Sequence, residues 1–188
     1  QSAAGAVTPG PEGRVLATYL AARKGETVTV KGWVHRIRSL GGVAFVLLRD
    51  RSGICQLVYD GEPDLSLESV VEVTGPVAAN EKAPGGFEIK AETTEVLAAA
   101  AHDLPISVNA EHGQIGLETL LEKRTLSLRN PAVRGIFEVQ AVIIDAFSEY
   151  LRAHGFTEIK TSKLIGTGTE GGTGLFEVEY FDRKVYLA

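Results

Sequence analysis

Five short runs of β-forming residues, separated by turns that contain glycine or proline, follow one another between residues 27 and 96. The runs are Thr27–Ile37, Val43–Leu48, Ile54–Tyr59, Val70–Val77 and Phe87–Val96. The first run alternates apolar and polar residues, whereas the second is almost wholly apolar, as expected of a strand that is covered on both faces. Short strands at this even spacing are typical of a small closed β barrel.

A helix is expected just before the first strand. The segment Arg14–Lys24 places its apolar residues on one helical face, and Gly25 follows as a stop signal. Five strands with a helix at one end fit a Greek-key barrel of the OB-fold type, which binds nucleic acid with one sheet face and its loops. Two interpretations therefore stay open for the barrel, a nucleic-acid-binding domain and a purely structural barrel.

Composition changes divide the chain into four parts. Residues 1–13 are expected to form a disordered tail, because they have neither the charged nor the apolar region of a signal peptide. Residues 14–97 hold the barrel, and the small, polar, proline-containing stretch 98–113 is interpreted as a linker. Residues 114–188 form the remaining part, in which helical periodicity appears.

The pattern of residues 114–188 predicts an α/β domain. Leu117–Glu122 predicts a short helix. Asn130 as N-cap and Pro131 at the first helical position begin a helix of about 23 residues, which ends at His154-Gly155. Three short strands are expected after it, at Phe156–Ile159, Leu175–Tyr180 and Lys184–Leu187.

The charge distribution limits the partners. The net charge is −5, which argues against a protein that coats nucleic acid indiscriminately. Residues 31–51, however, hold five basic residues and one acidic residue, a local charge of +4 that suits a selective RNA contact. Cys55 is the only cysteine, which excludes an intrachain disulfide and a cysteine zinc site and fits a reducing, cytoplasmic location. No apolar run approaches the roughly 20 residues that a membrane helix needs.

Several residues of the barrel could contact a nucleic-acid base. Phe45 could stack on a base, and Arg38 and Gln56 carry a guanidinium and an amide that could address base edges. From periodicity alone, a core phenylalanine, a solvated arginine and an ordinary surface glutamine are the alternatives.

The glycine-rich stretch Thr169-Glu170-Gly171-Gly172 is the clearest candidate for a small-molecule site. A carboxylate in a turn of this kind can hold an ammonium group, and the glycines let the backbone approach a ligand closely. A solvated glutamate in a loop is the alternative.

Two stretches resemble a known family. Residues 32–56, GWVHRIRSLGGVAFVLLRDRSGICQ, are similar to the signature of the anticodon-binding domain of aspartyl-, asparaginyl- and lysyl-tRNA synthetases. Residues 122–129, EKRTLSLR, resemble the segment that enters the class II catalytic domain. The long helix with the following GFTEI resembles class II motif 1, a dimer-interface element. The resemblance covers residues 14–188.

The resemblance implies an OB-fold anticodon-binding domain followed by the start of a class II catalytic domain, built on an antiparallel sheet with helices. The implied activity is ATP-dependent activation of L-aspartate and its transfer to tRNA. Within the family, the chain is most similar to archaeal-like aspartyl enzymes that charge both tRNA(Asp) and tRNA(Asn). An asparaginyl enzyme and a non-catalytic OB-fold RNA-binding module are the alternatives.

The resemblance assigns roles to individual residues whose positions match the family motifs. Glu170, with Gly171 and Gly172, would bind the amino group of L-aspartate. Phe45 would stack on an anticodon base, and Arg38 and Gln56 would read the middle base of the anticodon.

Two further residues bear on tRNA choice. The anticodons for aspartate and asparagine differ only in their third base. In this family, a proline in the loop between the fourth and fifth strands marks relaxed enzymes, and Pro84 occupies that loop here. Proline fixes φ and removes an N–H donor. Pro84 and His35 are therefore the expected residues of relaxed anticodon recognition, with an ordinary turn proline as the alternative.

The chain departs from the family in two places. Ser162 stands where motif 1 usually carries a proline, which bears on the homodimer contact expected through residues 131–163. Motifs 2 and 3, which hold ATP and Mg²⁺ in the family, do not occur in the sequence. The chain is therefore expected to correspond to the N-terminal part of such an enzyme, with no catalytic residue, no metal site and no adenylate-forming activity of its own.

Overall fold

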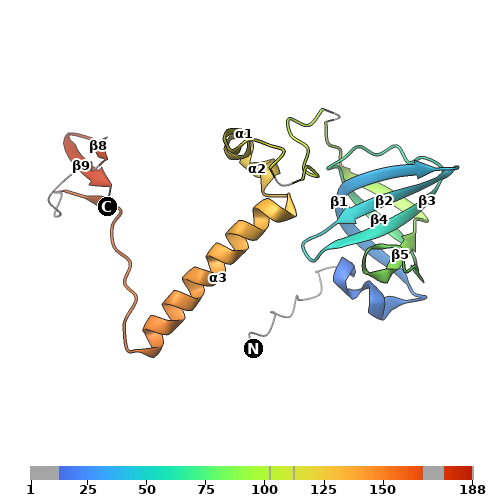
Figure 1. Cartoon of the computed structure of the whole chain (residues 1–188), viewed down its shortest axis with the longest axis horizontal. Helices are drawn as coiled ribbons and strands as arrows, with labels where there is room; N and C mark the ends of the chain where they lie inside the picture. Colours follow the sequence, from blue (N-terminus) through green and yellow to red (C-terminus); the bar gives the residue numbers. More distant parts are fainter. Residues whose placement is uncertain (1–12, 102, 112, 167–175, 188) are drawn as a thin grey trace. The chain divides into compact units, whose positions relative to one another are not determined.

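The computed structural model describes residues 13–101, 103–111, 113–166 and 176–187. The chain divides into two compact units, Gln1–Arg134 and Gly135–Ala188 (Figure 1).

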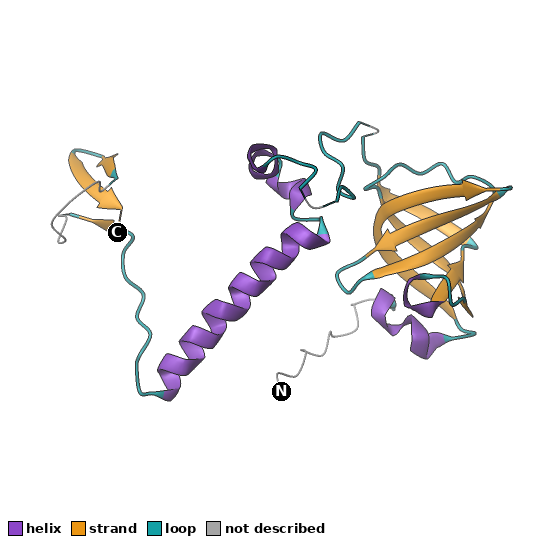
Figure 2. Ribbon diagram, viewed as in Figure 1, coloured by secondary structure: helices purple, strands orange, loops and turns teal. Residues whose placement is uncertain are grey.

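The first unit contains a closed barrel. Strands β1, β2 and β3 form an antiparallel meander. Strand β3 runs parallel to β5 (Phe87–Lys90), and β4 is antiparallel to both β5 and β1. The pairing between β1 and β4 closes the barrel (Figure 2). This arrangement confirms the predicted OB-fold architecture. The first four strands are Thr27–Leu40, Val43–Arg49, Ile54–Asp60 and Val70–Ala79.

The predicted fifth strand is divided in two. β5 covers Phe87–Lys90 and β6 covers Thr93–Ala98, and both pair with β4. Between them, the Ala91 N–H donates to the Val58 carbonyl at 2.9 Å and the Glu92 N–H donates to the Thr74 carbonyl at 3.0 Å. The chain therefore keeps β4 as its partner across these two residues, and its pairing with β3 ends there.

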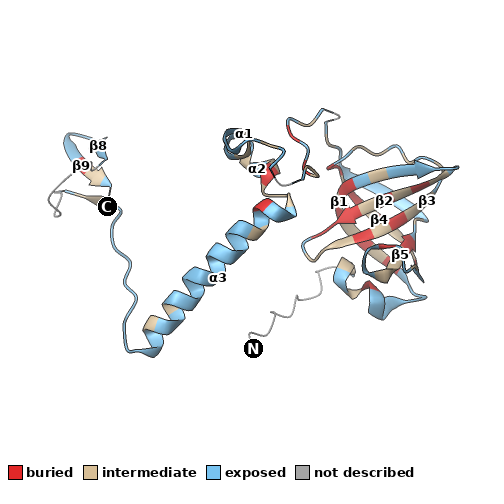
Figure 3. Cartoon of the chain, viewed as in Figure 1, coloured by how far each residue is buried: buried red, intermediate tan, exposed pale blue. Residues whose placement is uncertain are grey.

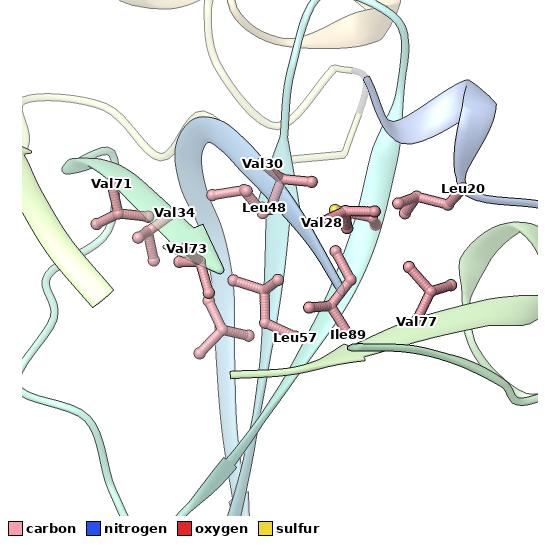
Figure 4. Close-up of a cluster of buried hydrophobic side chains, with 12 residues drawn as sticks. Leu20, Val28, Val30, Val34, Leu48, Leu57, Val71, Val73, Val77 and Ile89 are labelled. Carbon is pink, nitrogen blue, oxygen red and sulfur yellow. The ribbon is translucent and has the colours of Figure 1, made fainter. Parts of the chain in front are cut away.

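The barrel core consists mainly of β-branched and leucine side chains that point inward at every second position of the strands. Leu48 and Leu57 are almost completely buried in this core (Figure 4). Val46 is buried as well, whereas Leu47 and Gln56, which alternate with these residues, are only partly buried. Gly75 has no side chain because a Cβ there would lie 1.8 Å from the carbonyl oxygen of Lys90. The other members of the core are Leu20, Val28, Val30, Val34, Cys55, Val71, Val73, Val77 and Ile89.

The helix expected before the barrel is η1, Ala17–Arg23, and it is a 3₁₀ helix. Its i→i+3 pattern begins with the Tyr19 N–H, which donates to the Leu16 carbonyl at 2.9 Å. Asp50 holds the first turn, since its Oδ2 accepts the Ala17 N–H at 2.8 Å. The other oxygen, Oδ1, accepts the N–H and the hydroxyl of Ser52. Asp50 therefore joins the start of η1 to the β2–β3 turn.

Two short helices follow the barrel, α1 (Leu117–Glu122) and α2 (Arg124–Ser127). The long helix α3 covers Pro131–Ala153, as predicted. Asn130 caps it, because its Oδ1 accepts the N–H groups of Ala132 at 2.9 Å and Val133 at 3.4 Å.

The second unit holds most of α3 and an antiparallel sheet in the order β7-β9-β8. The strands are Leu164–Ile165, Glu177–Tyr180 and Arg183–Leu187. The strand predicted at Phe156–Ile159 is wrong, because within the described residues no strand pairs with this segment. Along α3 most side chains are exposed (Figure 3). None of the helices in the described part of the chain has the length and apolarity needed to cross a membrane.

Leu57→Ala is expected to destabilise the barrel by about 2–5 kcal/mol, because the side chain is fully buried and the surrounding strands cannot collapse into the cavity. Urea denaturation monitored by Trp33 fluorescence measures the change. Leu40→Ala is the control, since Leu40 is 74% exposed and its truncation should cost little. Equal effects of the two substitutions would contradict the core described above.

Candidate nucleic-acid interface

The outward-facing side chains of β1, β2 and β3 form two rows across the barrel. In one row Arg38 pairs with Phe45, which pairs with Val58. In the other, Arg36 pairs with Leu47, which pairs with Gln56. Because side chains alternate along a strand, burying Val46 places Phe45 and Leu47 on this outer face. Phe45 is half-buried there and is not a core residue.

Arg38, Phe45 and Gln56 lie around one open pocket of about 430 Å³. The structure thus brings together three residues that the sequence analysis singled out separately. Asn80 and Lys82 reach the same pocket from the loop after β4, and Ser39 and Leu40 reach it from the end of β1.

Hydrogen bonds fix the orientation of the Gln56 amide. Its Nε2 donates to Glu88 Oε2 at 2.9 Å, and Asn80 Nδ2 donates to the same oxygen at 2.6 Å. Because one N–H of the amide is directed at Glu88, the amide oxygen on the other side of the group can act as an acceptor. The pocket therefore offers an aromatic ring, a guanidinium donor and an oriented amide, which is the set of groups that binds an unstacked base.

Sequence reasoning missed Asn80, Lys82 and Glu88. Lys82 stands two residues before Pro84, so the loop that was singled out for its proline also supplies a cation. Glu88 became relevant only through the parallel pairing of β3 with β5, which places it opposite Gln56. No local sequence pattern indicates that pairing.

His35 lies inside the molecule and not on the outer face. The register of β1 against β2 shifts between Val34 and Arg36, so His35 occupies a β-bulge and is 9% exposed. Its Nδ1 lies 2.7 Å from a guanidinium nitrogen of Arg49. Burial and the nearby positive charge of Arg49 lower the pKa of His35 below its usual 6.5. The neutral imidazole accepts the hydrogen bond from Arg49.

Pro84 lies in the 3₁₀ turn η2, Pro84–Gly86, between β4 and β5. It is exposed, and it is not among the residues that line the pocket. Gly85 and Gly86 follow with φ of 75° and 81°, values in the left-handed region that favours glycine.

Part of the predicted basic cluster is neutralised within the barrel. Arg49 is buried and forms an ion pair with Glu68 at 2.8 Å, and Lys31 forms an ion pair with Glu72. Arg36 and Arg38 are exposed on the outer face. Of the predicted cluster, Arg38 is the cation that lines the pocket.

Glu170, Gly171 and Gly172 lie outside the described residues.

Ser162 stands where the resemblance would place the motif 1 proline. Its hydroxyl donates to the Leu164 carbonyl at 2.7 Å and accepts the Leu164 N–H at 3.2 Å, so it stabilises the turn in which it lies.

Comparison with known proteins agrees with this geometry. Residues 28–97 match a family described as an OB-fold nucleic acid binding domain, and residues 116–188 match the tRNA synthetases class II (D, K and N). The chain belongs to the class II tRNA synthetases of the D, K and N group. In this group of synthetases, the barrel is the anticodon-binding domain, as the resemblance implied.

Curated relatives of this synthetase chain include two enzymes named aspartate–tRNA(Asp/Asn) ligase. The enzyme of Deinococcus radiodurans is 42% identical over 95% of the chain, and that of Methanopyrus kandleri is 44% identical over 88%. The chain spans 41% of the length of each. Among solved structures, asparaginyl-tRNA synthetase from Pyrococcus horikoshii with asparaginyl-adenylate has a TM-score of 0.82 and 33% identity. That match covers 93% of this chain and 42% of the other.

The buried imidazole makes the stability of this synthetase chain depend on pH. The pKa of His35 is lowered in the folded state, so the unfolded chain binds the proton more tightly. The stabilisation is complete above pH 6.5 and is lost as the pH falls through the lower folded value. Urea denaturation between pH 7.5 and 5 should show wild type losing more stability than His35→Gln, which cannot titrate. Parallel losses would contradict a neutral, buried His35.

Proposed function

We propose that this chain is the anticodon-recognising part and the beginning of the catalytic domain of an aspartate–tRNA ligase that charges tRNA(Asp) and tRNA(Asn). The observation that carries the proposal is the pocket in which Arg38, Phe45 and Gln56 converge. In the proposed complex, the anticodon loop opens and one base stacks on Phe45. Arg38 donates to a base edge, and the oriented oxygen of Gln56 accepts from it.

Aspartate is the proposed amino acid. The relatives at 42–44% identity are named as aspartate ligases, whereas the asparaginyl structure is 33% identical. Glu170 would hold the ammonium group of the substrate, with Gly171 and Gly172 allowing close backbone approach. The structural likeness to the asparaginyl enzyme keeps that enzyme as the second candidate. A non-catalytic RNA-binding module is less favoured, because residues 116–188 match the synthetase family.

Relaxed tRNA choice is proposed to come from the loop between β4 and η2. Lys82 lines the pocket, while Pro84 removes an N–H donor from the adjacent turn. His35 is buried, so its proposed part is indirect, through the bulge that places Arg36 and Arg38 on the outer face. Few groups would then be placed to discriminate between the third bases of the two anticodons.

The complete reaction uses further components. Class II synthetases act with ATP and Mg²⁺: ATP supplies the adenylyl group that activates the carboxylate, with pyrophosphate as the leaving group, and Mg²⁺ neutralises the phosphate charge. In the described ranges, no group of three or more His, Cys, Asp or Glu side chains is arranged to bind a metal ion, so we assign neither component to a residue here. A cytoplasmic location is part of the proposal, since aminoacylation serves protein synthesis there.

A homodimer through residues 131–163 is also proposed. Helix α3 exposes a series of large apolar side chains, and a second copy of the chain is the proposed partner that covers them. The series consists of Ile136, Val139, Val142, Ile143, Ile144, Phe147 and Tyr150, each at least 57% exposed.

Phe45→Ala should weaken binding of an anticodon hairpin of tRNA(Asp) by about 1–3 kcal/mol, the usual worth of stacking one base on an aromatic ring. Fluorescence anisotropy at constant salt measures the dissociation constant. Phe87→Ala is the matched control, because Phe87 packs against the core and does not line the pocket. If both substitutions had the same effect per folded molecule, Phe45 would not be a base platform.

In the full-length enzyme of which this chain is the proposed part, Pro84→Lys should lower kcat/KM for tRNA(Asn) more than for tRNA(Asp). One new base contact is worth about 1–3 kcal/mol by analogy with DNA readout, so the ratio should change about 5- to 150-fold. Pro84→Ala separates the causes, since it restores the N–H without adding a long polar side chain. An unchanged ratio in both variants would remove Pro84 from the account of tRNA choice and leave the aspartate assignment standing.

A further inference from the structure

A buried carboxylate lies at the end of the barrel that faces the segment leading into α3. Glu68 precedes β4, and its side chain is 3% exposed. It has a φ of 66°, which is uncommon for a residue other than glycine. The backbone holds this conformation in place, because the Glu68 N–H donates to the Val34 carbonyl at 2.7 Å and the Val34 N–H donates to the Ser69 carbonyl at 2.9 Å.

Two arginines from distant parts of the chain share one oxygen of this carboxylate. Arg49, from β2, lies 2.8 Å from Glu68 Oε2, and Arg129, which precedes α3, lies 3.0 Å from the same atom. The Trp33 ring contacts both guanidinium groups, with centroid distances of 5.7 Å to Arg49 and 5.6 Å to Arg129. The carboxylate and the indole therefore hold a residue of the barrel and a residue beyond the linker together.

A second attachment is made by neutral groups. Asn109 Nδ2 donates to the backbone carbonyl of His35, in the bulge of β1. Asn130 Nδ2 donates to the carbonyls of Val108 at 2.9 Å and Ala110 at 3.0 Å, while its Oδ1 caps α3. Asn130, the N-cap of α3, is thus connected through residues 108–110 to β1, the strand that carries His35.

The two attachments meet at His35. Its backbone carbonyl accepts from Asn109, and its ring Nδ1 accepts from Arg49, which also contacts Glu68. The bulge that removes His35 from the RNA-facing surface therefore makes it the point where both attachments join the barrel.

The same strand face also leads to the base pocket. Phe45, Leu47 and Arg49 occupy alternate positions of β2, so all three lie on one face. Arg49 lies four positions along the strand from Phe45, about 13 Å at roughly 3.3 Å per residue. A rigid strand thus connects the pocket to the Glu68 cluster.

We propose that Glu68 is a positioning residue that fastens the segment entering the synthetase domain to the anticodon-binding barrel through Arg129. An RNA held in the pocket is then held at a fixed place relative to the start of α3. The inference about attachment stands on the contacts alone, and its consequence for aminoacylation rests on the proposed function.

Charge is what makes this attachment sensitive to single substitutions. Removing Glu68 would leave the buried guanidinium of Arg49 without its counter-charge, which is more costly than the loss of an exposed pair. In Arg129→Gln the barrel keeps its internal Arg49–Glu68 pair, so the barrel should stay folded while the segment loses its charged contact. In Glu68→Gln two arginines lose their partner, so this variant is expected to affect the barrel as well.

Amide hydrogen exchange of the 188-residue chain tests the attachment. In Arg129→Gln the amides of residues 104–111 and 124–130 should exchange at least about tenfold faster, while those of β2 and β3 keep their wild-type rates. Arg129→Lys retains the positive charge and should restore part of the protection. Arg23→Gln, which removes an exposed arginine from its ion pair with Glu26, is the matched control and should change neither region.

Unchanged exchange in Arg129→Gln would overturn the proposal. Equal acceleration in β2 and β3 would overturn it too, because Arg129 would then act on the barrel fold in general. Glu68→Gln serves as a second variant, and at least tenfold faster exchange in 124–130 is expected there whether or not the barrel is also affected.

A functional readout separates positioning from RNA contact. The Arg129→Gln chain should bind the anticodon hairpin with a dissociation constant within about twofold of wild type. In the full-length enzyme, the same substitution should lower kcat/KM for whole tRNA(Asp) at least about fivefold. Equal losses in both measurements would make Arg129 an RNA-binding residue and overturn the positioning role. If wild type bound no hairpin and charged no tRNA, the proposed function would fail, whereas the exchange experiment would still decide the attachment.

Discussion

The alternation of side chains along β2 is the constraint on which both the barrel and its outer face depend. Ala44, Val46 and Leu48 point into the closed barrel and supply its central packing. Because the period of a strand is two, Phe45 and Leu47 must then face outward. A shift of one residue in the β1–β2 register would bury the aromatic ring and expose the core, so core packing and the base pocket are fixed by the same pairing.

The barrel was largely predictable from sequence because its strands are marked by short-range signals. β-branched runs and glycine turns gave β1 to β4 within a few residues, and Asn130 with Pro131 gave the start of α3. The failures depend on long-range pairing. The fifth run divides where its pairing with β3 ends and its pairing with β4 continues. Phe156–Ile159 has β-forming residues but pairs with no strand in the described part of the chain.

The site was predictable in part. Arg38, Phe45 and Gln56 were identified through the resemblance, and the pocket that unites them follows from the antiparallel register of β1, β2 and β3. Glu88, which orients Gln56, depends on a parallel pairing that no local pattern indicates. The burial of His35 depends on a single bulge. Without that bulge, strand alternation alone would place its side chain on the outer face.

Photo-crosslinking tests most directly whether the outer face of β1, β2 and β3 is the RNA surface. A tRNA(Asp) anticodon hairpin with 4-thiouridine at the middle anticodon position is bound to the chain, irradiated and digested with trypsin. A crosslink in the peptide 39–49, which contains Phe45, or in the peptide 52–82, which contains Gln56, is the expected result. Crosslinks confined to residues 91–123, on the β6 side of the barrel and beyond, would contradict the account.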